Sequence, residues 1–474
     1  MLAHRFLAFA TSLTGLFMVA SSAAQDSTLL TREAFVQVVL NNHPVARQAA
    51  LRPELGEASV RSARGGFDPM AIATYDEKRF DEKSYFRLFD AGLKVPTWYG
   101  VELFAGVQQN SGDFLDPQAT TPGDGLLKLG GQVSVGQGLF IDQRRATLRK
   151  SQAYLRATRA EQEQMLNDLL LLALSDHTDW VAAYLALQVS NSAVGLASER
   201  LAAVRGSWRG GDRPAIDTLE AFLQVQDRQM RQQQATLAFR NASLRLSNHL
   251  WDDVQQPVEI QPNVVPDPMD LRSPGAFALA DTSIQHVVTN HPFLLQAGAR
   301  IDQLEIDRRL RGELLKPELD LKYQWLGNGA AVNDEGGTLL GDGHQFGVGF
   351  QMPLFLRRER GELSLAQLRQ QDASLALERD RLRIRNRIRE RANDIEVFGS
   401  QVRLGAEMVV NYERMLSGEN QRFMAGESSL FLMNGREVPL IDARIRQVEL
   451  EARLRKSYFS LDHEAGTLWR NWQR

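Results

Sequence analysis

Two long segments of equal length, at matching places in the two halves of the chain, constrain the fold more than any other feature. The first runs from Phe140 to Gly211 and the second from Phe355 to Gly426, so that both ends recur 215 residues later. The first contains no proline. A continuous helix of this length would span roughly 100 Å. That is far longer than a helix of a globular domain, so the pattern predicts a rod resembling a coiled coil.

The segments before these rods also recur. Asn42-His43-Pro44 returns as Asn290-His291-Pro292, 248 residues later. The chain is therefore a tandem duplication. Because the offset falls from 248 to 215 between Pro69 and Phe140, the first copy holds 33 additional residues there.

Shorter helical segments flank the first rod. Residues 31–66 have apolar spacing behind a capping Thr31, and Pro44 suits the first turn of a new helix. Pro214 opens a further helix that extends to about Trp251. Since these two segments together match the rod in length, we expect one long helix to pack beside two half-length helices.

The region in which the copies differ has the alternation of β-strands. Apolar residues occupy every second position over 319–325 and 346–352, and again over 101–107 and 127–135. Weaker strand candidates lie near 71–78 and 86–93, so the pattern leaves four or six strands open. Long polar loops, Gln109–Gly125 and Gly327–Gly343, separate the strands.

Composition excludes several classes of site. The chain has no cysteine and a net charge of −3, and we find no catalytic group, metal site, cofactor motif or nucleic-acid-binding pattern. Asp176-His177-Thr178-Asp179 could be a metal or proton site, but a helix-contact patch fits better. His43 and His291 could be ligands, but a capping role beside proline fits better. Alternating arginines over 379–391 fit a solvated or acid-paired rod surface.

Residues 1–24 have the order of a secretory signal peptide. His4-Arg5 precede an apolar run, and Ser22-Ala23-Ala24 forms a small-residue cleavage site. An uncleaved anchor or a disordered terminus is the alternative. We expect no later segment to be long and apolar enough to cross a bilayer as a helix, so the protein would enter a membrane through its strands.

The two glycine turns at the far ends of the rods are the candidate functional site. Polar side chains follow each glycine, either as ordinary helix-end polarity or as an acid-lined mouth and docking surface. The candidate residues are Gly211, Asp212, Asp217, Glu220, Gly426, Glu427, Asn434, Arg436 and Glu437.

The repeated Asn-His-Pro elements, the Leu139-Phe140 and Leu354-Phe355 junctions and the two glycine turns together resemble the TolC-like outer-membrane efflux proteins. The resemblance implies a homotrimer that shares one β-barrel in outer-membrane lipid above a long α-helical barrel in the periplasm. It also implies a periplasmic adaptor and an inner-membrane pump of RND or ABC type as partners. The protein would be a passive exit duct for an efflux pump or a type I secretion system, not an enzyme.

Two features depart from that family. Its aspartates six and nine residues after the second glycine are here Leu432 and Gly435, although Asp217 matches an acidic position of the first repeat. The family usually has four strands per chain, and the 33 added residues could supply two more.

We therefore expect a mainly α-helical chain with a membrane β-barrel region and duplicated strand-helix repeats. The alternative is a soluble periplasmic coiled-coil adaptor or scaffold. The expected segments are a signal peptide (1–24), periplasmic helices (25–66), barrel strands and loops (67–139), periplasmic helices (140–251), a linker (252–272), periplasmic helices (273–316), barrel strands and a loop (317–354), and periplasmic helices (355–474).

Overall fold

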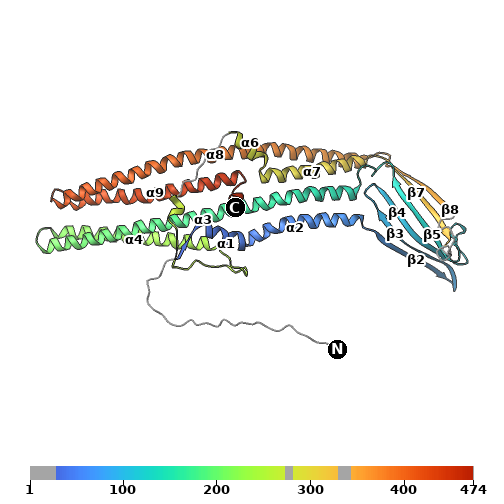
Figure 1. Ribbon diagram of the computed structural model, residues 1–474, viewed down its shortest axis with the longest axis horizontal. Helices are drawn as coiled ribbons and strands as arrows, with labels where there is room; N and C mark the ends of the chain where they lie inside the picture. Colours follow the sequence, from blue (N-terminus) through green and yellow to red (C-terminus); the bar gives the residue numbers. More distant parts are fainter. Residues whose placement is uncertain (1–27, 273–280, 329–342, 473–474) are drawn as a thin grey trace, which may run out of the picture.

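The protein is a rod of helices with a β-sheet at one end (Figure 1). The computed structural model describes residues 28–272, 281–328 and 343–472. The expected signal peptide and most of the loop Gly327–Gly343 lie outside the described residues.

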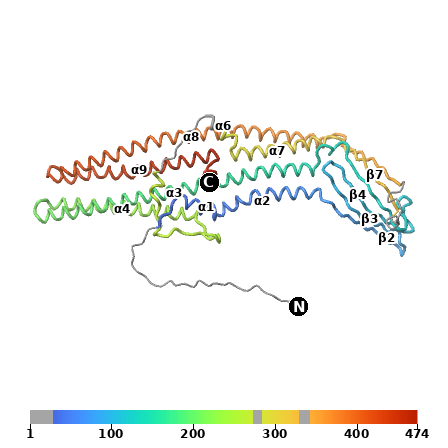
Figure 2. The backbone as a smooth tube through the Cα atoms, in the orientation of Figure 1, coloured from blue at the N-terminus to red at the C-terminus, as the bar shows by residue number. Residues whose placement is uncertain are grey.

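Two helices run nearly the full length of the rod. They are α3 (Gln143–Arg209, 67 residues) and α8 (Arg357–Met424, 68 residues). Along α3 lie α4 (Ala215–Ser247) and α2 (Pro44–Arg64), placed end to end, and α9 (Leu430–Glu464) and α7 (Pro292–Glu313) lie in the same way along α8 (Figure 2). The prediction of one long helix beside two half-length helices is confirmed.

The half-length helices begin where the sequence indicated. Thr31 caps α1 (Arg32–Asn42), and its side chain accepts a hydrogen bond from Ala34 N. His43 caps α2 through Nδ1, which accepts from Val45 N at 3.1 Å, with Pro44 in the first turn. His291 does the same for α7 with Phe293 N. The capping role of the two repeated histidines is confirmed.

The sheet has six strands in the described residues, which answers the question that the sequence left open. All neighbours are antiparallel, in the order β2-β3-β4-β5-β7-β8. The strands are β2 (Met70–Phe80), β3 (Lys83–Pro96), β4 (Val101–Ser111), β5 (Leu126–Ser134), β7 (Glu318–Asn328) and β8 (Gly343–Gln351). Strands β2 and β3 are the two weak candidates in the first copy, so the 33 additional residues account for them.

The two faces of the sheet differ in chemistry. One face carries apolar residues in register, for example Val101, Val133, Leu321 and Val348 across four strands. The other carries ion pairs such as Lys94–Glu102 (2.6 Å), along with Lys128–Asp90. An apolar outer face and a polar inner face are what a membrane barrel requires.

The middle of the rod holds the largest apolar core. Phe35, Leu170, Leu174 and Trp180 are fully buried there. Strand β1 (Thr28–Leu30) pairs in parallel with β6 (Val264–Pro266), so the segment 252–272, expected to be a linker, contains structure of its own. The remaining elements are η1 (Gly65–Phe67), η2 (Pro117–Ala119), α5 (Met269–Arg272), α6 (Asp281–Thr289) and η4 (Trp469–Trp472).

One expectation from the sequence is wrong. By length and composition, α3 contains a stretch apolar enough to cross a membrane. Leu169, Leu170, Ala173 and Leu174 in α3 pack instead into the mid-rod core, so part of its apolar character serves helix packing.

Candidate functional site

The turn between α3 and α4 forms the tip of one helical hairpin, at the end of the rod far from the sheet (Figure 1). Gly211 has φ +84°, the left-handed conformation that favours glycine. Gly211 N donates to Trp208 O, and Asp212 N donates to Ser207 O. This pair of hydrogen bonds is a Schellman motif, which ends a helix and reverses the chain.

The turn between α8 and α9 repeats the same geometry. Gly426 has φ +78°. Gly426 N donates to Phe423 O, and Glu427 N donates to Arg422 O. The two hairpins therefore end in one turn type, as expected from their shared offset in the sequence.

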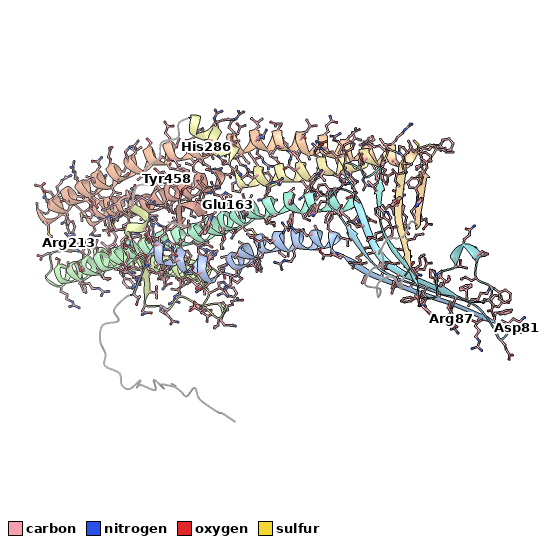
Figure 3. The ribbon with its side chains drawn as sticks, turned by 45° about the vertical axis from the view of Figure 1, so that its right-hand side comes forward. Asp81, Arg87, Glu163, Arg213, His286 and Tyr458 are labelled. Atoms are coloured by element: carbon pink, nitrogen blue, oxygen red, sulfur yellow. The ribbon has the colours of Figure 1, made fainter. Side chains whose placement is uncertain are left out.

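An apolar cluster holds the two tips against each other. Leu201 and Val204 of α3, Val225 of α4 and Leu430 of α9 are buried together, with Phe423 of α8 packed against them. Arg213, labelled at the tip in Figure 3, lies with its guanidinium 4.5 Å from the centre of the Phe423 ring. The tip is thus one unit built from both repeats.

A polar network beside this cluster also joins the repeats. Asn434 Nδ2 donates to Glu220 Oε1 at 3.3 Å, and Asn434 Oδ1 accepts from Arg200 Nη1 at 3.3 Å. Arg200 also forms an ion pair with Glu437, whose side chain is 2% exposed. The structure therefore brings together three of the expected site residues and adds Arg200, which the sequence analysis missed.

The other candidate residues lie apart from this network. Asp217 pairs with Arg213 of its own chain at 3.3 Å. Arg436 lies 3.6 Å from Glu419 of α8, and a hydrogen bond from Ser428 lowers the pKa of Glu419 below its ordinary value. Asp212, Glu427, Leu432 and Gly435 are exposed at the two tips.

The polar cluster within α3 makes helix contacts. Asp176 Oδ2 lies 2.7 Å from His249 Nε2, and Asp179 pairs with Lys456 of α9. His177 is buried, and burial lowers its pKa to about 3, so it is neutral in most conditions. No group of three or more His, Asp or Glu side chains within the described ranges could hold a metal ion.

The carboxylate of Asp270 is buried close to His177. Asp270 Oδ2 accepts from Arg32 N at 2.9 Å and lies 3.8 Å from His177 Nε2. Burial raises the pKa of Asp270 to about 6. These contacts join α1, α3 and α5, so the cluster is part of the mid-rod packing.

The arginines between 379 and 391 are largely paired with acids, as the sequence indicated. Asp380 lies 3.2 Å from both Arg379 and Arg383, and Arg387 lies 3.7 Å from Glu464 of α9. Arg391 lies 2.7 Å from Asp394. These arginines lie on the rod surface and form ion pairs within α8 and with α9.

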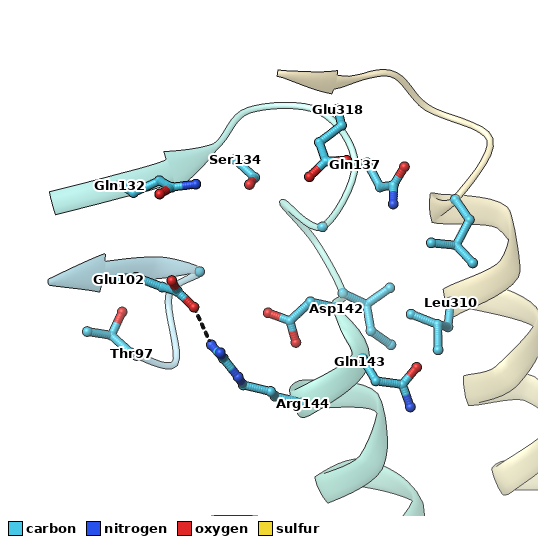
Figure 4. A pocket seen from close by; sticks show the side chains of 14 residues that line it. Thr97, Glu102, Gln132, Ser134, Gln137, Asp142, Gln143, Arg144, Leu310 and Glu318 are labelled. Carbon is cyan, nitrogen blue, oxygen red and sulfur yellow. Dashed lines mark hydrogen bonds and ion pairs between the residues drawn. The ribbon is translucent and has the colours of Figure 1, made fainter. Parts of the chain in front are cut away.

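A cleft of about 390 Å³ lies where the sheet meets the helices (Figure 4). Arg144 of α3 reaches Glu102 of β4 at 2.6 Å across it, and Asp142 caps α3 by accepting from Arg145 N. Arg145 donates in turn to the carbonyls of Gly138 and Leu139. These contacts fix the strand-to-helix junction, and the cleft carries no catalytic arrangement.

The fold and the site define the class of protein: an antiparallel sheet with one apolar face is joined to a long rod that ends in two helical hairpins. The chain has the fold of several solved outer-membrane channels. With the open-state MtrE channel of Neisseria gonorrhoeae the TM-score is 0.67 at 14% identity, covering 92% of this chain and 89% of that one. With the CmeC channel of Campylobacter jejuni it is 0.63 at 14% identity, covering 92% and 85%. VceC of Vibrio cholerae gives 0.62 at 14% identity, covering 91% and 95%.

Residues 283–467, which span most of the second repeat, match the family of outer membrane efflux proteins. No curated protein matches the chain. The resemblance to TolC-like channels is confirmed: the second repeat matches a family whose members are channels and not enzymes, and the chain as a whole has the fold of such channels. The outer-membrane efflux channels that it resembles span the outer membrane and extend into the periplasm. Channels of this family are trimers that work with an adaptor and an inner-membrane pump.

Proposed function

We propose that three copies of this chain form the outer-membrane exit duct of a tripartite efflux pump. The duct is a passive conduit, and energy comes from an inner-membrane pump that a periplasmic adaptor connects to the tip. A type I secretion system is the other export machine that such a duct can serve.

The observation that carries the proposal is an uncovered apolar stripe on α4. Its members recur every seven residues and are each more than half exposed: Ile216, Leu223, Met230, Leu237 and Leu244. A stripe with this period is the contact face of a coiled coil. One chain leaves it uncovered, so another helix must pack against it.

Helix α8 exposes apolar residues at the same level of the rod as α4. Its half toward the tip carries Val397, Leu404, Met408 and Met415, which are 37–59% exposed. Helices α4 and α8 lie at opposite edges of the rod (Figure 1). Packing α4 of one copy near α8 of the next would extend the wall of helices and close it into a hollow cylinder.

The strand region supports the channel over the soluble adaptor. Phe346, Val348 and Phe350 of β8 are 57–70% exposed on the apolar face. In water such a surface would cause aggregation, whereas in lipid it is covered. An open sheet edge is not tolerated in lipid, so the sheet must close with other copies.

The tip is the proposed docking surface for the adaptor. Gly211, Asp212, Gly426 and Glu427 are exposed at the end of the rod farthest from the sheet. Glu220, Asn434, Arg436 and Glu437 lie behind them and would set the spacing of the two hairpins. Asp217 is the acidic residue proposed for the aperture.

Membrane fractionation with a carbonate wash tests the channel against the adaptor. We expect the mature chain to stay in the outer-membrane pellet and to give a mass of three chains in mild detergent without heating. A monomer released by the wash would overturn the proposal.

Topology and cargo need separate measurements. An epitope tag near Asp116, in the β4–β5 loop, should be labelled on intact cells, and a tag at Asp212 only after permeabilisation. Loss of the gene should raise dye accumulation in an efflux system, whereas in a secretion system it should retain a polypeptide inside the cell.

A further inference from the structure

The two edges of the sheet fit each other in length, and this suggests how neighbouring copies join. Within the described chain, β2 and β8 each pair with one neighbour only. Strand β8 has nine residues. Strand β2 is regular from Met70 to Lys78, also nine residues, before its register shifts between Lys78 and Arg79.

We propose that β2 of one copy pairs antiparallel with β8 of the next, with Ala73 opposite Val348, so that three copies close a barrel of 18 strands. This deepens the proposed function, because it rests on the trimer. The barrel lumen is incomplete in any single copy.

The observed register sets the geometry of closure. Starting at Ala71 and following directly paired residues across the sheet leads through Leu93, Ala105, Leu129 and Trp325 to His344. This path runs perpendicular to the strands, since antiparallel hydrogen bonds do. It starts near the helix side of β2 and ends near the loop side of β8. The sheet is therefore staggered in the sense of a tilted barrel.

Side-chain alternation restricts which β2 residue can lie opposite His344. His344 is on the apolar face, because it pairs with Trp325. Its partner must be on the same face of β2, which carries the odd-numbered residues from Ala71 to Arg79. Because His344 lies near the loop side of β8, the candidates are those toward the loop side of β2: Tyr75, Glu77 and Arg79. A partner one residue away would turn the apolar face inward.

The strand tilt restricts the choice further. Each residue rises about 3.3 Å and each strand adds about 4.8 Å. Moving from Ala71 to Glu77 over six strands gives a tilt of about 35°, and moving to Arg79 gives about 43°. Moving to Tyr75 gives about 25°, outside the range of about 35–45° typical of barrels.

One observation favours Glu77. This register pairs Met70 with Gln351 and Lys78 with Gly343, so all nine residues of β8 meet the regular part of β2. The same match keeps the helix-side rim of the sheet level. Relative to the perpendicular path from Ala71 to His344, β2 begins one residue toward the helices, at Met70, and β8 ends seven residues toward the helices, at Gln351. These two strand ends are level when the next copy is shifted by six residues, which is the step from Ala71 to Glu77.

The side chains that meet in this register are compatible. On the outer face Tyr75 lies opposite Phe346, an aromatic pair of the kind that stabilises antiparallel sheets. On the inner face Thr74 lies opposite Gly347 and Ile72 opposite Gly349. Neither a charged pair of like sign nor two large inner residues are brought together.

An 18-stranded barrel is wide. At this tilt its backbone radius is about 17 Å, against about 11 Å for 12 strands. Barrels of 16–18 strands leave an aqueous channel. Lys94, Glu102, Lys128 and Lys322 would face this lumen, so the exit would be polar and charged.

Engineered cysteines test the register directly, because the chain has none of its own. The variant Ala73→Cys/Val348→Cys should give covalent trimers on mild oxidation, which a reductant returns to monomers. The inner pair Thr74→Cys/Gly347→Cys tests the same register at the adjacent position. Directly opposed residues in both kinds of antiparallel pair lie within disulfide reach.

The control variants shift the pair by two residues in each direction. Tyr75→Cys/Val348→Cys reports the register with Arg79 opposite His344, and Ala71→Cys/Val348→Cys reports the register with Tyr75 there. Both should cross-link at least tenfold less than Ala73→Cys/Val348→Cys. A control that cross-links best would overturn the register.

Mass measurement of the unheated, unoxidised variants separates this inference from the proposed function. Trimers that fail to cross-link at both test pairs would overturn the β2–β8 pairing and leave the duct standing. A monomeric wild type would overturn both.

Discussion

Arg200 of α3 forms an ion pair with Glu437 of α9, and this pair joins the two hairpins across 237 residues of sequence. Glu437 is 2% exposed and Arg200 19%. Asn434 braces the same guanidinium and also holds Glu220. The spacing of the two tips therefore depends on a nearly buried charge pair.

Removing the positive charge of Arg200 should destabilise the packing of the two hairpins at the tip. Arg200→Met leaves the carboxylate of Glu437 buried without its partner, which costs about 3–5 kcal/mol at full burial. We expect faster proteolytic cleavage near residues 207–214 and a lower apparent Tm. Glu437→Gln should cost less, because the freed Arg200 can reach water.

Two controls make this test specific. Arg414→Met alters an exposed arginine of α8 outside the cleaved segment and should leave cleavage unchanged. The double variant Arg200→Met/Glu437→Leu should recover much of the loss. Equal cleavage of Arg200→Met and Arg414→Met would contradict a structural role for the pair.

Bulky residues at the turn glycines should uncouple assembly from export. Gly211→Trp and Gly426→Trp force a side chain into a left-handed conformation, at about 1–2 kcal/mol per site. Open space surrounds both positions, so no packing is lost. We expect normal trimer levels with most efflux lost, scored by unheated gel migration and dye accumulation.

A matched control lies five residues before the first turn. Gly206 is helical and also faces open space. Gly206→Ala should stabilise α3 by about 0.5–1 kcal/mol, whereas Gly211→Ala should destabilise it. Undiminished efflux in both tryptophan variants would show that the tips are not the docking surface.

The capping histidines should make the rod sensitive to acid. Burial lowers the pKa of both His43 and His291 to about 4, against about 6.5 when unfolded. A depressed pKa means that the stabilisation is complete above about pH 6.5 and is lost as pH falls toward 4. The reason is local, since a protonated Nδ1 cannot accept from the helix N–H.

Asparagine separates capping from titration, because it caps helices well and does not ionise. His43→Asn/His291→Asn should show a smaller fall in apparent Tm between pH 6.5 and 4 than the wild type, by circular dichroism. His286→Asn, at an exposed position, is the control and should keep the wild-type profile. A double variant with an unchanged pH profile would argue against this mechanism.

The features predicted from the sequence are those that depend on local pattern or on the duplication. The two long helices, the caps at Thr31, His43 and His291, and the glycine turns follow from nearby residues. The strand count was left open because β2 and β3 alternate weakly, and their place in the sheet depends on β4.

The network at the tip could not be predicted, because its members are far apart in sequence. Arg200 stands in the middle of a uniform helix, and nothing near it indicates that Glu437 lies opposite. The same reason hid the partner of Arg213, whose contact with Phe423 crosses between repeats. The sequence shows only that Arg200 is a charged residue within a long helix, and this does not identify its partner.

Asp217 is the last candidate to test, and the structure sharpens the test. Its carboxylate lies 3.3 Å from Arg213 of the same chain, and the side chain is 23% exposed. A partly exposed pair of this kind contributes about 1 kcal/mol or less. The carboxylate thus remains available to a cation in the pore, with its charge partly compensated.

Opposite effects are therefore expected from the two partners. Because Leu432 stands at the matching position of the second repeat, a trimer carries three such carboxylates rather than six. Asp217→Asn should weaken divalent-cation block of single-channel current several-fold, and Arg213→Ala should strengthen it, because the carboxylate loses its internal partner. Glu427→Gln, an exposed acid at the other tip, is the control. If Asp217→Asn leaves the block as it is in the wild type, Asp217 serves only to hold Arg213 against Phe423.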